Sequence, residues 1–179
     1  MNEEVIIRRI RDGERAAMRE LYAETVAYMA GVCQRYVTNR EDVKDILQES
    51  YVQIFQHIGS FCPQKAGSLR IWMSRIVANR CISLLRQQHK LRWEPCSDLP
   101  DIPDEPLDPK LVRIETVHQL IRQLPPGYRA VLNLYVFEQK SHREIADMLG
   151  IKEKTSASQL LRAKATLKKL MLNHINDEQ

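Results

Sequence analysis

The side chains that could do chemistry in this chain are hydrogen-bonding and charged groups rather than nucleophiles or metal ligands. The four cysteines lie far apart without a C-x-x-C pair, and the five histidines do not cluster with them, so a zinc site is not expected. No phosphate-binding loop, zinc-protease motif or nucleophile elbow occurs. We therefore expect no catalytic residue, no metal and no cofactor, and we do not expect an enzyme.

Near the C-terminus, polar and basic residues have the spacing of a DNA-reading helix. Ser141 and Glu144 have the form of a capping box, which predicts the start of a short helix. Gly150 stands where a helix end needs a left-handed residue, and a longer helix is predicted over 153–172. A short helix, a turn and a longer helix predict a helix-turn-helix, whose second helix enters the major groove. The alternative is a helical hairpin with a solvated basic face.

The predicted last helix has two faces. Its packing face is assigned to Ser156, Leu160, Ala163, Leu167 and Leu170. Its opposite face offers hydrogen-bonding groups and small apolar groups for base edges, and further cations and hydroxyls for phosphates. The candidate DNA-binding residues there are Lys154, Thr155, Ala157, Ser158, Leu161, Arg162 and Lys164.

Apolar spacing of three and four residues predicts helices almost everywhere else, and no segment alternates like a strand. Long amphipathic helices are expected over 14–37 and 40–58, and a third begins near Leu69. Five prolines lie between Trp93 and Pro109, where helix is disfavoured and an extended linker is predicted. The expected fold is all-α, with two small helical domains (1–92 and 111–179) joined by a Pro-rich acidic linker (93–110).

The charges are distributed unevenly along the chain. Residues 1–92 hold 15 Lys and Arg against 10 Asp and Glu, and residues 113–179 hold 11 against 7. Residues 93–112 hold one Lys against six acids. Two basic lobes around an acidic segment favour a protein that meets a polyanion at two places. No apolar run could span a membrane and no signal peptide is visible, so we expect a cytoplasmic protein.

Three segments resemble a known family, the extracytoplasmic-function (ECF) sigma factors of bacterial RNA polymerase. Its fourth conserved region resembles residues 144–167, EIADMLGIKEKTSASQLLRAKATL. Two motifs of its second region resemble 41–51, EDVKDILQESY, and 72–80, WMSRIVANR. The resemblance implies that the chain directs core RNA polymerase to promoters in response to an extracytoplasmic or stress signal. It also implies that one lobe reads a −10 element and the other a −35 element.

The resemblance implies roles for particular residues of the N-terminal lobe. Contacts to core polymerase are expected from Asp42, Asp45, Gln48 and Glu49. Acids early in a helix also complement its dipole, but Gln48 and Glu49 lie beyond the first turn. Contacts to the −10 element are expected from Lys65, Ser68, Trp72, Arg75, Asn79, Arg80 and Arg86. Trp72 at this spacing is more often a core residue than a platform for a base.

The resemblance also implies an inhibitory partner, an anti-sigma factor, for a protein that is otherwise a monomer when free. The acids of the linker could mimic nucleic acid near the RNA path, or could form a solvated spacer. The alternative function is a stand-alone helix-turn-helix regulator with an N-terminal sensing domain. Three positions depart from the family's usual residues, Lys152, Ser156 and Ala157, and they leave the preferred −35 sequence open.

Overall fold

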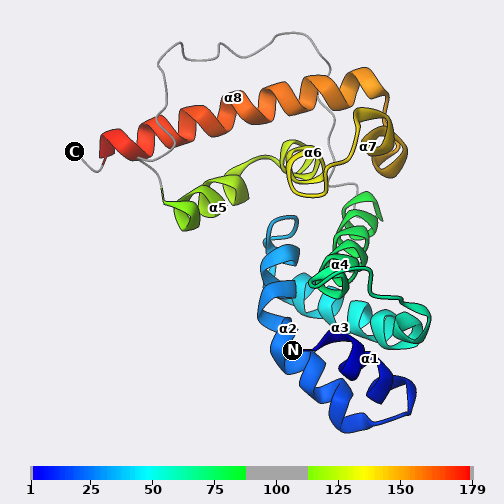
Figure 1. Ribbon diagram of the computed structural model, residues 1–179. Helices are drawn as coiled ribbons and strands as arrows, with labels where there is room; N and C mark the ends of the chain where they lie inside the picture. Colours follow the sequence, from blue (N-terminus) through cyan, green and yellow to red (C-terminus); the bar gives the residue numbers. More distant parts are fainter. Residues whose placement is uncertain (1, 88–112, 178–179) are drawn as a thin grey trace. The chain divides into compact units, whose positions relative to one another are not determined.

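The computed structural model describes residues 2–87 and 113–177 (Figure 1). Every regular element in these two ranges is helical, which confirms the expected all-α fold. The elements are α1 (Glu3–Arg11), α2 (Arg15–Gln34), α3 (Arg40–His57), a 3-10 turn η1 (Ile58–Ser60), α4 (Ser68–Gln87), α5 (Ile114–Gln123), α6 (Pro126–Val136), α7 (His142–Leu149) and α8 (Glu153–Asp177). None of the described helices is long and apolar enough to cross a membrane.

The chain divides into two compact units, Met1–Ser83 and Leu84–Gln179. The sequence places the boundary later, between 92 and 93, and the predicted linker at 93–110 lies outside the described residues. Each unit has its own apolar core, so each is described by itself.

The core of the first unit lies between α2, α3 and α4. Leu21 and Met29 of α2, Ile54 of α3, and Met73 and Val77 of α4 are completely buried there. Burying such side chains contributes about 1.5–3 kcal/mol each. The predicted helices over 14–37 and 40–58 agree with α2 and α3 to within three residues.

A nine-residue helix, α1, was not expected from the sequence. Asn2 caps it by accepting a hydrogen bond from the backbone N–H of Val5 at 3.3 Å. Ile6, Ile7 and Ile10 face inward and are almost completely buried. An Asn followed by Glu3 and this apolar spacing is a helix-start signal that could have been recognised.

Two cysteines pack as small apolar residues in the core of the first unit. Cys33 of α2 and Cys81 of α4 are completely buried, with their Sγ atoms 3.5 Å apart, and both are free thiols. Burial raises the pKa of the Cys81 thiol well above its ordinary value, so that this group stays protonated. Such a thiol is a packing residue rather than a reactive one.

The second unit is built from α5, α6, α7 and α8. The long helix α8 packs against the other three, with α6 and α7 toward its N-terminal half and α5 toward its C-terminal half (Figure 1). The helix α5 ends at Gln123, two residues before Pro125. Pro126 then occupies the first turn of α6, where its missing N–H costs no helical bond.

Two glycines should respond in opposite directions to the same substitution. Gly150 after α7 has a φ of +69°, so Gly150→Ala should lower the free energy of unfolding by about 1–2 kcal/mol. Gly31 lies inside α2, where an added Cβ would meet nothing within 4 Å. Gly31→Ala should therefore raise the free energy of unfolding by up to about 1 kcal/mol. Urea unfolding of both variants tests this, and a stabilising Gly150→Ala would contradict the left-handed turn.

Candidate nucleic-acid and polymerase interfaces

The first helix of the helix-turn-helix, α7, begins with the capping box predicted from the sequence. The Ser141 Oγ accepts a hydrogen bond from the Glu144 N–H at 3.2 Å, and the Glu144 carboxylate accepts one from the Ser141 N–H at 2.9 Å. Lys140 Nζ donates to the other carboxylate oxygen at 2.8 Å. Lys140, together with these Ser141 bonds, lowers the pKa of Glu144 to about 2. At the other end, Gly150 takes the predicted left-handed conformation.

Ser156, a departure from the family's usual aliphatic residue, has a partner inside the helix-turn-helix. It is completely buried on α8, and its Oγ lies 3.0 Å from Nδ1 of His142 on α7. The His142 ring stacks on Tyr135 of α6, with ring centroids 5.0 Å apart. A hydroxyl at this position therefore links α7 to α8 by a polar contact that an aliphatic side chain could not make.

The outer face of α8 presents most of the predicted DNA-binding residues to solvent. Lys154, Ala157, Leu161 and Lys164 are exposed, and Thr155 and Ser158 are half-buried. These residues form the first three turns of the helix, the part that a helix-turn-helix inserts into a groove. We refer to these six residues as the α8 face.

Arg162 was predicted to bind DNA, but the structure does not place its side chain on the α8 face. Only 6% of Arg162 is exposed, and Ala165 on the next turn is also buried. The two faces predicted for this helix require that α8 packs along one narrow stripe. Because α5, α6 and α7 all pack against it, α8 buries a wider arc of side chains, and this arc includes Arg162.

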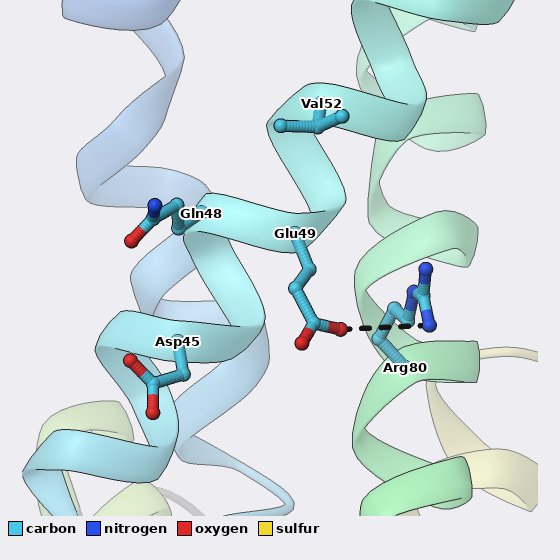
Figure 2. Close-up of a pocket in the computed structure, with 5 residues that line it drawn as sticks. All are labelled: Asp45, Gln48, Glu49, Val52 and Arg80. Atoms are coloured by element: carbon cyan, nitrogen blue, oxygen red, sulfur yellow. Dashed lines mark ion pairs between the residues drawn. The ribbon is translucent and has the colours of Figure 1, made fainter.

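The predicted polymerase-binding residues share one side of α3. Asp45, Gln48 and Glu49 are exposed and border an open hollow of about 350 Å³ together with Val52 and Arg80 (Figure 2). Asp42 lies one turn earlier and is half-buried in the first turn, where Asn39 caps the helix. We call these side chains the acidic surface: Asp42, Asp45, Gln48, Glu49 and Val52.

Val52 is a member of the acidic surface that sequence reasoning missed. It is 53% exposed, although it is a β-branched apolar residue. Its position one turn after Gln48 and Glu49, away from the buried residues of α3, was visible in the sequence. An exposed apolar side chain with polar side chains around it can be covered by a partner, since contact surfaces combine an apolar centre with a polar rim.

Arg80 faces the acidic surface, although it was predicted to bind the −10 element. Its NH1 lies 3.5 Å from Oε2 of Glu49, and both side chains are largely exposed (Figure 2). At about 100° per residue, Arg80 lies about 100° around α4 from Asn79. The side of α4 that carries the other predicted residues is therefore not the side that carries Arg80.

The other predicted −10 residues of α4 form one stripe along the helix. Ser68, Trp72, Arg75 and Asn79 fall within an arc of about 60°, and Arg86 continues the same register. Arg75, Asn79 and Arg86 are exposed, whereas Ser68 and Trp72 are half-buried. These five residues are the α4 stripe.

A loop before α4 brings Lys65 to the start of this stripe. Lys65 is exposed and borders a hollow of about 470 Å³ whose other side is formed by the beginning of α1. Phe61, at the start of the loop, lies against Trp72 with ring centroids 5.0 Å apart. Trp72 is thus partly packed and partly accessible, and both interpretations made from the sequence remain open.

These surfaces offer charged, polar and aromatic side chains that can bind ligands. Within the two described ranges, no group of three His, Cys, Asp or Glu side chains could hold a metal ion. One unit carries an acidic surface beside a basic and aromatic stripe, and the other carries a helix-turn-helix with a basic outer face. A helix-turn-helix with a basic outer face is typical of DNA-binding proteins.

Comparison with known proteins gives the family. Residues 21–91 match region 2 of the sigma-70 family, and residues 114–167 match its region 4. The chain is 26% identical to the ECF RNA polymerase sigma-E factor of Haemophilus influenzae, over 92% of both chains. It is 25% identical to ECF RNA polymerase sigma factor SigE of Mycolicibacterium smegmatis, over 92% of this chain and 66% of that one. The protein belongs to the sigma-70 family and, within it, to the ECF sigma factors, which direct RNA polymerase to promoters.

A solved structure has the same fold. It is described as CnrH in complex with the cytosolic domain of CnrY, and it matches with a TM-score of 0.51 at 22% sequence identity. The match covers 94% of this chain and 96% of that chain. Because region 2 accounts for the N-terminal helices, the alternative of a sensing domain in front of a helix-turn-helix is not supported.

Truncating Arg162 should affect stability more than DNA binding. Arg162→Ala removes a buried side chain from α8 and should lower the free energy of unfolding by about 1–3 kcal/mol. Lys164→Ala, on the exposed face of the same helix, should change it by no more than about 0.5 kcal/mol. Urea unfolding compares the two variants. Unchanged stability together with weaker duplex binding in Arg162→Ala would contradict this interpretation and would show that Arg162 contacts DNA.

The capping box should make stability depend on pH in the acid range. The folded pKa of Glu144, about 2, lies below its ordinary 4.5, so its charge stabilises the fold above about pH 4.5. That contribution is lost as the pH falls from 4.5 toward 2. Glu144→Gln should therefore flatten the fall in the free energy of unfolding across this window, while Asp147→Asn on the same helix serves as the control. Parallel pH curves for wild type and Glu144→Gln would contradict the assignment.

Proposed function

We propose that the acidic surface of α3 binds core RNA polymerase, that the loop and stripe of α4 bind the −10 element, and that the α8 face binds the −35 element. On this proposal the protein is an initiation factor with no catalysis of its own, and it acts in the cytoplasm in response to an extracytoplasmic or stress signal. The observation that carries the proposal is that one helical unit carries both the acidic surface of α3 and the α4 stripe, and that the stripe lies on a side of α4 other than the one that faces Glu49.

Binding of polymerase at α3 is supported by the state of the side chains there. Asp45 and Gln48 are exposed, and their outward position leaves them available to a partner. Glu49 pairs with Arg80 at 3.5 Å, and exposed ion pairs of this kind contribute about 1 kcal/mol or less. A basic group on a partner could replace Arg80 as the ion-pair partner of Glu49 with little loss of free energy. Val52 would then be covered and would add apolar area to the contact.

Promoter binding by the first unit is supported by the stripe on α4. Lys65 and Arg75 supply positive charge, which attracts phosphates without regard to sequence. Arg86 would add charge from the last turn of α4, beyond the boundary of this unit. Asn79 offers an amide that can pair with the edge of an unstacked base, and the exposed part of Trp72 offers a ring face. Arg80 would contribute to this site only after leaving Glu49.

Promoter binding by the second unit is supported by the first turns of α8. Lys154, Thr155 and Lys164 are suited to phosphates, and Ser158 to either a phosphate or a base. Ala157 and Leu161 are suited to contact with a thymine methyl group. Without Arg162, the α8 face holds no arginine for bidentate recognition of guanine. The −35 preference is therefore expected to rest on apolar and hydroxyl contacts.

Membership of the ECF group also suggests an inhibitor. We propose that an anti-sigma factor holds the protein inactive, and that the protein is a monomer when free of partners. The acidic and apolar character of the α3 surface would let such an inhibitor compete with polymerase. Transcription in vitro, with and without the protein encoded by the neighbouring reading frame, would test the inhibitor directly.

Weakening the acidic surface should weaken assembly with polymerase. The double variant Asp45→Ala, Glu49→Ala should raise the Kd for core RNA polymerase by roughly ten- to one hundred-fold, because central charged contacts carry much of such an affinity. Asp12→Ala removes an exposed carboxylate elsewhere in the same unit and should leave the Kd unchanged. Titration of labelled protein with core polymerase measures both.

The wider proposal is tested by initiation itself. Purified protein and core polymerase should start transcripts at a subset of promoters sampled from the genome that encodes them. Failure to form a stable complex with core, together with no initiation at any sampled promoter, would overturn the proposed function.

A further inference from the structure

The first residues of the chain are bound to the loop proposed to contact the −10 element. The Glu3 carboxylate accepts hydrogen bonds from the N–H of Gly67 at 3.1 Å and the N–H of Leu69 at 3.2 Å. It also lies 3.4 Å from the hydroxyl of Ser68, which donates to it. These contacts join α1 to residues more than sixty positions further along the chain.

Glu3 supplies the cap that the start of α4 needs. The first N–H groups of a helix have no partner within it, and a carboxylate there also complements the helix dipole. The N–H of Ser68 donates to the Lys65 carbonyl at 3.1 Å. The N–H groups of Gly67 and Leu69, on either side of Ser68, donate to the Glu3 carboxylate. Gly67 has a φ of +84°, so the loop turns sharply into α4 at this point. The cap of α4 thus comes from another helix.

A second contact from α1 reaches the other end of the loop. Arg11 NH2 donates to the carbonyl of Phe61 at 3.1 Å, and Phe61 is the residue that lies against Trp72. The two ends of α1 therefore hold the two ends of the 61–67 loop. Pro63, Gln64 and Lys65 lie between these attachments and border the hollow shared with Asn2, Glu3 and Glu4.

α1 is itself fixed firmly enough to act as a support. Its three isoleucines are buried in the first unit. Arg9 makes a two-pronged contact with Glu14, at 2.8 and 2.6 Å, and a third bond to Glu20 of α2 at 2.7 Å. Glu14 and Glu20 raise the pKa of Arg9, and Arg9 in turn lowers the pKa of Glu14, so that both groups stay charged. A loop attached to α1 is therefore attached to a rigid part of the fold.

We propose that Glu3 and Arg11 are positioning residues that hold the 61–67 loop in the shape that binds promoter DNA. The inference rests on the proposed function of that loop. It also changes the role of Ser68, which was predicted to contact DNA: its hydroxyl is directed to Glu3, so Ser68 positions the loop. Lys65 is left as the basic residue of the loop that meets the DNA.

The test compares Glu3→Ala with Glu4→Ala, which removes an exposed carboxylate on the same helix. Hydrogen exchange in the full-length protein should show faster exchange at the amides of Gly67 and Leu69 in Glu3→Ala and no change in Glu4→Ala. Unchanged exchange at both amides would overturn the inference. If Glu3→Ala fails to fold, Glu3→Gln is used, which keeps the size and one acceptor but loses the charge.

The functional measurement uses the holoenzyme. Open-complex formation on its promoter should slow by roughly three- to ten-fold in Glu3→Ala, because the apparent affinity scales with the fraction of loops in the binding shape. The Kd for core polymerase and the Kd for duplex DNA that contains the −35 element should both stay within two-fold of wild type, roughly the scatter expected for distant sites. A merely destabilised protein would lose all three together.

Lys65→Ala separates failure of the inference from failure of the proposed function. If Lys65→Ala slows open-complex formation and Glu3→Ala does not, the loop binds the promoter but α1 does not position it. If Lys65→Ala has no effect, the loop is not part of the promoter contact and the proposed role of the first unit is wrong. Glu3→Gln should fall between wild type and Glu3→Ala, since one of its two acceptor oxygens remains.

Discussion

The burial of one side of each helix is the constraint on which the rest of this structure depends. A helix of 18 to 25 residues is stable in water chiefly because its apolar face packs against other helices. In α3 this fixes Val43, Ile46 and Ile54 inward, and it thereby turns Asp45, Gln48 and Glu49 outward. The surfaces proposed to bind polymerase and DNA are thus the faces that packing leaves exposed.

Much of this arrangement could be predicted from the sequence because it depends on local patterns. The capping box at Ser141, the left-handed Gly150 and the ends of α2 and α3 follow from residue types a few positions apart. The family could also be recognised, since its motifs are runs of neighbouring residues. The predicted linker lies outside the described residues, so its shape remains a prediction.

What could not be predicted depends on contacts between distant parts of the chain. The burial of Arg162 follows from three helices packing on α8, and helical periodicity alone gives no count of neighbours. The pairing of Arg80 with Glu49 needs the relative rotation of α3 and α4. The cap that Glu3 gives to α4 joins positions more than sixty residues apart, which no local motif encodes. By contrast, α1 itself was missed although its signals were local.

The length of α8 has a mechanical consequence. It runs unbroken for 25 residues, which at 1.5 Å per residue is about 37 Å. Its first turns carry the α8 face, while Leu167, Leu170 and Met171 toward its other end pack with Val117 and Leu120 of α5. A continuous helix transmits a tilt from one end to the other with little bending. The α8 face, which is proposed to bind DNA, is therefore part of the same continuous helix that packs on α5, so a tilt of one end of α8 would displace the other.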